Sequence, residues 1–144
     1  MGLVEHDFVQ ILSLGDISLK SSPLDEIAFI SKGMSVGGLK ILMEQLGWRR
    51  KEMAEALSLE LETLELHLAS GDVLPRYLTE QALEIARLAS KGAFSFGGVT
   101  WFNTWLNSPN IEFAQQTPFS VINTIRGRAM AERVMLGLDA GVVG

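Results

Sequence analysis

The sequence predicts an all-α fold, and two features of the chain lead to this class. From Ser35 onward, apolar residues recur at intervals of three and four positions, which is the spacing of one helix face. The first such stripe consists of Leu39, Leu42, Met43 and Leu46. Glycines, which commonly stop helices, follow the periodic segments at Gly47, Gly71 and Gly92. We therefore expect a helix-turn-helix-like module followed by a small helical domain.

The composition is that of a globular protein rather than a disordered one. Of the 144 residues, 47% are hydrophobic and 20% are charged, which supplies enough apolar material for a core. The length fits one domain or two small helical modules. The chain has no cysteine, which excludes disulfides, thiolate metal sites and a cysteine nucleophile. A net charge of −5 argues against general nucleic-acid binding but leaves room for a local basic patch.

We expect three segments along the chain: residues 1–34, 35–96 and 97–144. The first is predicted to be a partly ordered arm, because Gly15-Asp16 and Ser21-Ser22-Pro23 interrupt its apolar residues. Within this arm, Glu26 to Ser31 fits either a short strand or the end of a helix. The second segment is the predicted helix-turn-helix-like domain, for dimerisation and DNA binding. The third is the small C-terminal helical domain.

The middle segment has the layout of a helix-turn-helix. A short helix is expected from Arg49 to Leu57, and Ser58 is the expected N-cap of a second helix, from Glu60 to Ser70. Two short helices joined by a tight break, after a supporting helix, form this layout, which many other helical proteins share. The apolar positions expected inside the pair are Met53, Ala54, Leu57, Leu61, Leu64 and Leu68.

The chemistry of this pair gives only limited support for DNA binding. The second helix of a helix-turn-helix enters the major groove, and here it carries Glu62 and Glu65 but no Lys or Arg. Phosphates repel carboxylates, and bidentate readout of guanine needs Arg or Lys. Basic residues lie instead at the start of the first helix of the pair, with Arg76 after the pair, and they either hold phosphates or simply form a solvated helix start. The predicted DNA contacts are Arg49, Arg50, Lys51, Thr63, His67 and Arg76.

The C-terminal part of the chain is also expected to be helical. A longer helix is predicted from Thr79 to Lys91, followed by a hinge at residues 94–98. Trp101 and Trp105 are placed on the next helix, which is expected to end at Ser108-Pro109-Asn110. Two further helix starts and the inner face of the last helix are predicted at Thr117-Pro118, at Thr124, and at Met130, Val134 and Leu138.

No catalytic, metal or cofactor site is predicted. His6 and His67 are the two histidines, and neither has the spacing of a metal site on one helix face. Acidic residues of the middle segment fit the first turn of a helix, where the helix dipole favours negative charge. Gly37-Gly38 and Gly97-Gly98 lack the Lys and Ser or Thr of a phosphate-binding loop. We also expect no signal peptide, no membrane span and a cytoplasmic location.

Several motifs resemble those of the Xre/MbcA/ParS family of type II antitoxins. The more specific ones are Trp105-Leu106-Asn107-Ser108-Pro109-Asn110, Thr117-Pro118-Phe119 and Asn123-Thr124-Ile125-Arg126-Gly127. Those of the N-terminal half, such as Lys51 to Leu57 and Leu78 to Ala89, are more general. The chain departs from the family where Gln115-Gln116 replace the usual glycine, and where Glu65 and His67 replace basic residues.

The resemblance implies a dimeric antitoxin that joins an Xre-like helix-turn-helix module to a toxin-binding domain. Its last helix and tail plug the active-site cleft of a cognate toxin. Toxins of this group have the RES fold, are related to ADP-ribosyltransferases, and degrade NAD or transfer its ADP-ribose. The helix-turn-helix module represses the operon, and no cofactor is required. A stand-alone helix-turn-helix transcriptional regulator is the alternative, and an enzyme of unknown type is a second one.

The resemblance also places candidate toxin contacts at the end of the chain. Arginine is favoured for ion pairs at interfaces, and an uncharged tail is thin enough to enter a narrow cleft. The alternative is that the arginines only solvate their helix and that the tail has no partner. The predicted toxin-binding residues are Arg126, Arg128, Arg133, Gly141, Val142, Val143 and Gly144.

Overall fold

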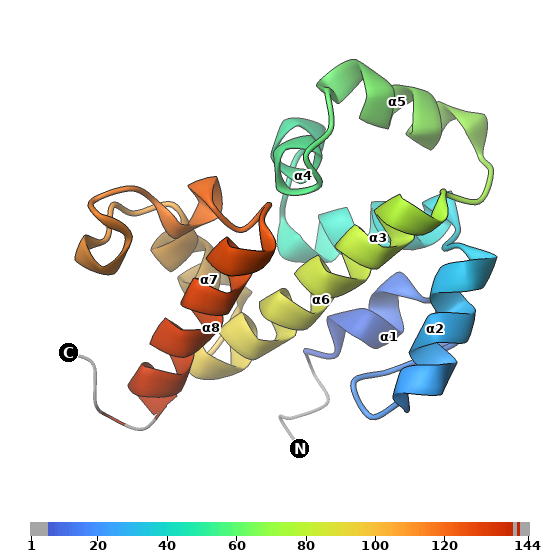
Figure 1. The fold of residues 1–144 in the computed structure, drawn as a ribbon. Coiled ribbons are helices and arrows are strands. Elements are labelled where there is room, and N and C mark those ends of the chain that lie inside the picture. The colour runs from blue at the N-terminus through green and yellow to red at the C-terminus, as the bar shows by residue number, and fades with distance from the viewer. Residues whose placement is uncertain (1–5, 140, 142–144) are drawn as a thin grey trace. The chain divides into compact units, whose positions relative to one another are not determined.

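The computed structural model describes residues 6–139 and residue 141, and in this part of the chain the fold is all-α, as predicted (Figure 1). The helices are α1 (Phe8–Leu12), α2 (Pro23–Lys32), α3 (Val36–Leu46), α4 (Arg50–Ala56), α5 (Leu61–Ser70), α6 (Arg76–Phe96), α7 (Val99–Leu106) and α8 (Ile125–Asp139). Two short 3-10 helices, η2 (Ile111–Phe113) and η3 (Pro118–Ser120), lie between α7 and α8. The chain divides into two compact units, one up to Arg87 and one from Leu88 onward. The long helix α6 therefore contributes to both units.

The N-terminal region is more structured than the partly ordered arm that we expected. Phe8, Val9 and Leu12 of α1 are buried, and α1 packs against α3. The close approach depends on Gly38, where a Cβ would clash with the carbonyl oxygen of Leu12. The packing of α1 was not predicted from the sequence because its apolar run is short and a turn follows it directly. Three buried side chains nevertheless anchor it to the core of the first unit.

Residues 26–31 are helical, so the alternative of a short strand is wrong. They belong to α2, whose start is capped by Ser22: its Oγ accepts a hydrogen bond from the Asp25 N–H (3.2 Å). Pro23 occupies the first helical position, where its missing N–H costs nothing. An ion pair between Glu26 and Arg87 ties α2 to the first part of α6. Capping and this pair stabilise a helix in a segment with weak apolar periodicity.

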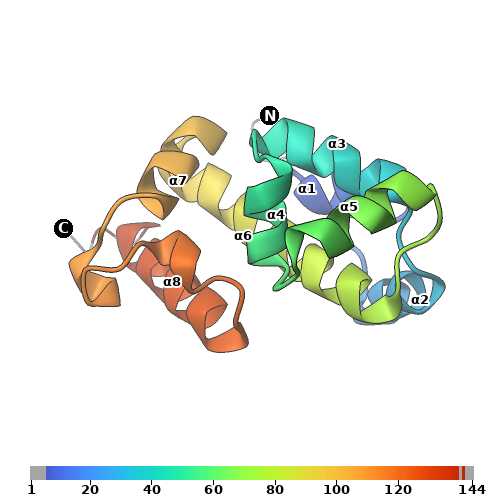
Figure 2. The same cartoon turned by 90° about the horizontal axis from the view of Figure 1, so that it is seen from above.

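The short helices α4 and α5 pack against each other, and α5 also lies beside α3 (Figure 2). The turn between them differs from the prediction. Ser58 does not cap α5, because it lies in the left-handed region (φ 59°) at the end of α4, and Glu60 holds the N-cap position. The Leu59 N–H donates to the Ala54 carbonyl (2.8 Å), which closes the turn. Of the predicted inner positions all are buried except Leu61, which is exposed.

The second unit is built around a cluster of aromatic side chains. The Trp105 ring contacts Phe96 in a tilted arrangement, with ring centroids 5.1 Å apart, and Phe113 edge-to-face, with ring centroids 5.9 Å apart. Phe102 is buried against Gly92 of α6, where a Cβ would clash with the ring. These contacts fix α7 on the end of α6. The predicted helix through Trp101 and Trp105 is confirmed as α7.

The predicted hinge at residues 94–98 is narrower than expected. Residues 94–96 continue α6, and the turn is made by Gly97 and Gly98 alone, with φ angles of 82° and 150°. Further along, Thr117-Pro118 starts the 3-10 turn η3 rather than an α-helix, with the Thr117 Oγ1 accepting from the Ser120 N–H (3.3 Å). The cap at Thr117 was therefore predicted correctly, but the type and length of the helix that follows it were not.

Thr124 caps the last helix, as predicted. Its Oγ1 accepts a hydrogen bond from the Gly127 N–H (2.8 Å). The inner face of α8 is offset from the predicted positions. Met130, Val134 and Leu138 are half-buried, whereas the helix buries Gly127, Arg128, Ala131 and Met135. Two of these four buried residues are a glycine and an arginine, and a prediction based on the spacing of large apolar residues does not include them.

Candidate functional site

The three arginines of α8 have two different environments. Arg126 and Arg133 are exposed, and neither forms an ion pair with the described residues. Arg128 is only 8% exposed, and its Nη1 donates to the carbonyl oxygen of Ile122 (3.0 Å). A guanidinium held in this way is part of the fold of the unit. The expectation that Arg128 faces a partner is therefore corrected, and the surface of α8 presents two arginines rather than three.

The start of α8 is fixed by tight backbone packing. Gly127 lies so close to Val121 that a Cβ would clash with the Val121 carbonyl oxygen. Together with the Thr124 cap and the Arg128 hydrogen bond, this contact locks the turn at residues 121–127 onto the first turn of the helix. The exposed side chain of Arg126 is thus carried on a rigid base. The Thr124 cap was predicted from the sequence, but the close contact between Gly127 and the Val121 carbonyl was not.

The end of α8 is marked by Gly141. This residue is left-handed (φ 73°), and its N–H donates to the Leu138 carbonyl (3.0 Å), as in a common helix stop. The predicted contacts Val142, Val143 and Gly144 lie outside the described residues. Of the predicted tail, only Gly141 has a described position, and it is exposed.

A groove of about 160 Å³ lies between the end of α6 and α8. It is lined by Lys91, Phe94 and Ser95 of α6 and by Glu132, Met135, Leu136 and Asp139 of α8. Two polar contacts join the helices across it: Lys91 Nζ to Glu132 Oε1 (3.4 Å) and Ser95 Oγ to Asp139 Oδ2 (3.2 Å). The sequence analysis missed this groove. The only signal is that its α8 residues recur at intervals of three and four positions, which marks one helix face.

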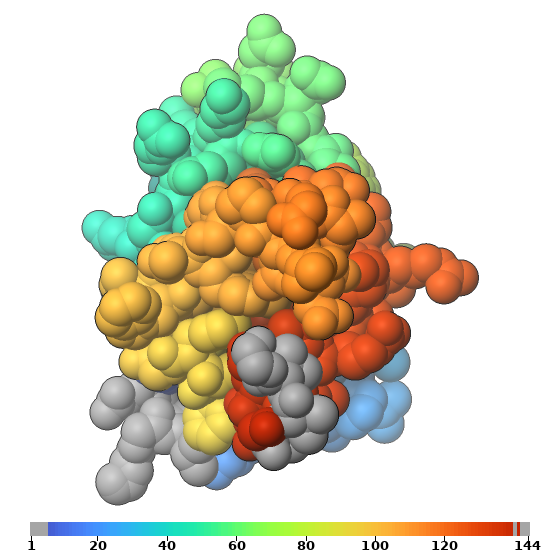
Figure 3. All heavy atoms as spheres, turned by 90° about the vertical axis from the view of Figure 1, so that its left-hand side faces the viewer, coloured from blue at the N-terminus to red at the C-terminus, as the bar shows by residue number. Residues whose placement is uncertain are grey.

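The rest of the second unit offers a mixed surface. Figure 3 shows the orange side chains of the segment between α7 and α8 beside the red side chains of α8. Trp101 of α7 and Ile111 of η2 are exposed large apolar residues that do not line the groove. They provide matched positions for comparing the groove with other exposed apolar side chains of the unit.

The predicted DNA contacts gather at α4 and α5 only in part. Arg49 Nε lies 3.6 Å from Glu52 Oε1, and Arg50 Nη1 lies 3.9 Å from Glu65 Oε2. Two of the basic residues are thus already near carboxylates. The remaining positions are the exposed Lys51 and Arg76 and the half-buried Thr63 and His67. The local charge is balanced rather than strongly positive.

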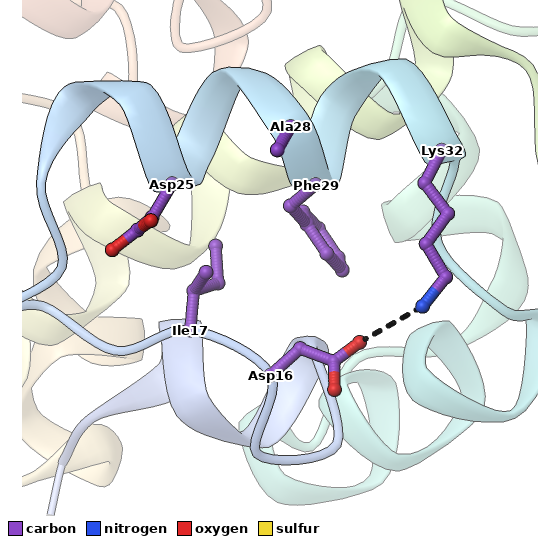
Figure 4. A pocket seen from close by; sticks show the side chains of 6 residues that line it. All are labelled: Asp16, Ile17, Asp25, Ala28, Phe29 and Lys32. Carbon is purple, nitrogen blue, oxygen red and sulfur yellow. Dashed lines mark ion pairs between the residues drawn. The ribbon is translucent and has the colours of Figure 1, made fainter.

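A second cavity, of about 220 Å³, lies in the first unit beside α2 (Figure 4). Phe29 and Ile17 form its apolar wall. Lys32 Nζ and Asp16 Oδ2 meet at one side of it, 3.6 Å apart. The pair lies on the surface, where such contacts contribute little to stability. Its lining has the character of a shallow surface hollow.

Two searches of the described residues bear on other classes of site. They hold no group of three or more His, Asp or Glu side chains placed to bind a metal ion. None of their helices is long and apolar enough to cross a membrane.

Comparison with known proteins identifies the class to which this arrangement belongs. Residues 93–141, from the end of α6 through α8, match the family described as "Antitoxin Xre/MbcA/ParS C-terminal toxin-binding domain". The unit with the groove and the exposed arginines is therefore the toxin-binding part of an antitoxin from a toxin–antitoxin system.

A curated relative extends the likeness beyond this unit. The chain is 26% identical over 131 residues to the "Prs ADP-ribosylating antitoxin" of Sphingobium sp. (strain YBL2), which covers 85% of this chain and 82% of that protein. The C-terminal unit thus matches the toxin-binding domain of Xre/MbcA/ParS antitoxins, and the resemblance noted in the sequence is confirmed.

Proposed function

We propose that this antitoxin neutralises its cognate toxin by stoichiometric occlusion of the toxin's active site, using α8 and the residues that follow it. The observation that carries the proposal is the match of residues 93–141 to a toxin-binding domain, because this match includes the whole of α8 and ends at Gly141, two residues after the helix. Occlusion requires no catalytic residue and no cofactor. The exposed Arg126 and Arg133 then form ion pairs with carboxylates around the toxin's cleft.

The partner in this proposal is a RES-type toxin that consumes NAD or transfers ADP-ribose. The support comes from the family resemblance and from the relative, whose name links an antitoxin with ADP-ribosylation. An enzyme of this kind has to bind a dinucleotide in a cleft, and we expect a helix that is followed in the sequence by small, uncharged residues to enter such a cleft.

Co-expression with the protein encoded by the neighbouring gene tests the proposal. We expect the neighbour alone to stop growth, and the pair to grow and to co-purify as a stable complex. A toxic neighbour that this chain neither rescues nor binds would contradict the proposal.

Truncation separates the contribution of the tail from that of α8. A chain that ends at Ala140 lacks Gly141, Val142, Val143 and Gly144 but retains the described helices. We expect this variant to fold normally and to neutralise the toxin more weakly. Full neutralisation by the truncated chain would limit the inhibitory surface to α8 itself and exclude a role for the tail.

A second activity, autoregulatory binding of operator DNA by a homodimer, is supported by one observation. The α4–α5 pair follows a supporting helix and carries Arg49, Arg50 and Lys51 at its start, where they can contact phosphates. Thr63, His67 and Arg76 are the further DNA contacts in this proposal, and the binding species is a homodimer, either alone or with the toxin bound.

Substitution of Arg49, Arg50 and Lys51 by alanine tests the second activity. We expect operator binding to be abolished in a salt-dependent shift assay, while toxin neutralisation is unchanged. Loss of toxin binding in this variant would contradict the separation of the two functions. Specific operator binding together with failure of toxin rescue would favour the alternative function, a stand-alone transcriptional regulator.

A further inference from the structure

We propose that the groove between α6 and α8 seats an apolar side chain of the toxin that is flanked by a basic residue. This inference rests on the proposed function and adds a second contact to it, separate from Arg126, Arg133 and the tail. The groove is the place on the second unit where exposed apolar walls, a closed floor and a defined charge come together.

The groove is apolar where a side chain would enter it. Phe94 is 61% exposed and Leu136 is 67% exposed, and they stand on opposite helices. Met135, which is buried, forms part of the floor between them. Methionine is unbranched and flexible, so this floor adapts to the shape of an inserted side chain. Covering Phe94 and Leu136 removes apolar surface from water, which favours association.

The groove is also preformed. The ion pair Lys91–Glu132 and the hydrogen bond Ser95–Asp139 connect its two walls at two levels, which lie one turn apart on α6 and two turns apart on α8. A site whose walls are already held at their final spacing loses little conformational entropy when a partner binds. These contacts lie on the rim and leave the apolar floor between them.

The charge of the rim favours a basic neighbour of the inserted residue. Glu132 and Asp139 carry two negative charges, and Lys91 supplies one positive charge. Lys91 pairs with Glu132, so the remaining negative charge of the rim lies on Asp139, whose Oδ2 accepts a hydrogen bond from the uncharged Ser95 hydroxyl. Asp139, the last residue of α8, is therefore the expected contact for a cation of the partner.

The position of the groove in the sequence indicates why the occupant is the toxin. Every residue that lines it, except Lys91, falls within the matched toxin-binding domain at residues 93–141. Trp101 and Ile111 lie in the same matched domain, yet they have no part in the groove. The proposal therefore distinguishes among exposed apolar residues of a single unit.

The test is calorimetric titration of the full-length chain with its toxin. We expect Phe94→Ala and Leu136→Ala each to raise the Kd by roughly tenfold or more, as for truncation of a buried interface anchor. Asp139→Lys should also weaken binding, with a loss that shrinks at high salt. The matched controls Trp101→Ala and Ile111→Ala should change the Kd by less than about threefold. Thermal melting checks that each variant is folded.

The outcomes separate this inference from the proposed function. Wild-type affinity in both groove variants, with intact binding by the parent chain, would overturn the groove and leave the proposed function standing. Unchanged toxin affinity together with loss of self-association would assign the groove to a second copy of the chain and equally overturn the inference. A parent chain that does not bind the toxin would overturn both. A Leu136→Lys variant provides the same test if Phe94→Ala melts early.

Discussion

The helices α5 and α8 both face potential macromolecular partners, but they differ in the charge of their exposed surfaces. α5 presents Glu62 and Glu65 and has no Lys or Arg, whereas α8 presents Arg126 and Arg133 as well as Asp139. Helix geometry alone would offer α5 to DNA, because the α4–α5 pair has the layout of a DNA-binding motif. The side chains argue otherwise. We infer from this comparison that the charge on the exposed face of a helix, more than the arrangement of the helices, determines which partner it can bind.

The two regions also differ in how they use arginine. Next to α5, Arg50 lies near Glu65, so the positive charge of Arg50 is partly neutralised within the molecule. In α8, Arg128 is drawn into the interior and holds the Ile122 carbonyl, while Arg126 and Arg133 are left without an ion pair among the described residues. Arg128 therefore stabilises the fold of the unit, whereas Arg126 and Arg133 are exposed on its surface. Variants of these positions separate folding from binding.

The largest effect is expected for Gly127→Ala. The added Cβ meets the Val121 carbonyl oxygen, which is backbone and cannot turn aside, so the start of α8 has to move. We expect the free energy of unfolding to fall by about 3 kcal/mol, together with a loss of toxin neutralisation. Chemical denaturation measures the first effect and growth rescue the second.

Gly37→Ala in α3 is the control for that variant. Its Cβ would meet only the Ser35 Oγ, at 3.7 Å, so we expect a stability equal to or slightly above that of the parent chain. A Gly127→Ala protein as stable as Gly37→Ala would show that the close contact between Gly127 and Val121 is not needed for stability.

A somewhat smaller effect is expected for Arg128→Met. The variant loses a charge-assisted hydrogen bond and leaves the Ile122 carbonyl without this donor, so we expect a loss of about 2 kcal/mol in stability. Arg133→Met, at an exposed position of the same helix, should leave stability within about 0.5 kcal/mol of the parent. Equal melting temperatures for the two variants would contradict the different roles assigned to the buried Arg128 and the exposed Arg133.

Charge reversal at the projecting positions should act on binding alone. We expect Arg126→Glu combined with Arg133→Glu to weaken toxin binding roughly tenfold, because favourable pairs become repulsive contacts. The thermal midpoint should not change, and the difference from the parent chain should shrink at high salt. Calorimetry at two salt concentrations checks both points. An unchanged Kd at low salt would place the toxin on another face of the unit.

The smallest effect is a gain in stability from Gln115→Gly. Gln115 lies in the left-handed region (φ 70°), where glycine has no steric penalty, and its N–H donates to the Asn110 carbonyl (2.9 Å) in either case. We expect about 0.5 kcal/mol of added stability, measured by chemical denaturation, with toxin binding unchanged. A loss of stability instead would mean that the Gln115 side chain contributes to this turn.

The fold class and several elements could be predicted from the sequence because local rules determine them. The stripe through Leu39, Leu42 and Leu46, the Thr124 cap and the helix through Trp101 and Trp105 all follow from spacing and capping chemistry. The packing of α1 could not be predicted in this way. It depends on a tertiary contact at Gly38, and no local pattern distinguishes that glycine from its neighbour Gly37.

The candidate site was less accessible to sequence reasoning. Three arginines in eight residues look alike in a sequence, and only the path of the chain at residues 121–127 turns Arg128 inward. The groove unites residues of α6 and α8 that lie some forty positions apart, as Ser95 and Asp139 do, so no local motif announces it. Charge, by contrast, could be read directly, and the acidic character of α5 was evident from the start.

Occlusion of the toxin by α8 is best tested by titrating toxin activity with this chain, with NAD consumption as the readout. We predict inhibition that saturates at one chain per toxin active site, is weakened by Arg126→Glu combined with Arg133→Glu, and is unaffected by alanine at Arg49, Arg50 and Lys51. Inhibition that is lost on changing the three N-terminal basic residues and retained after reversal on α8 would contradict it.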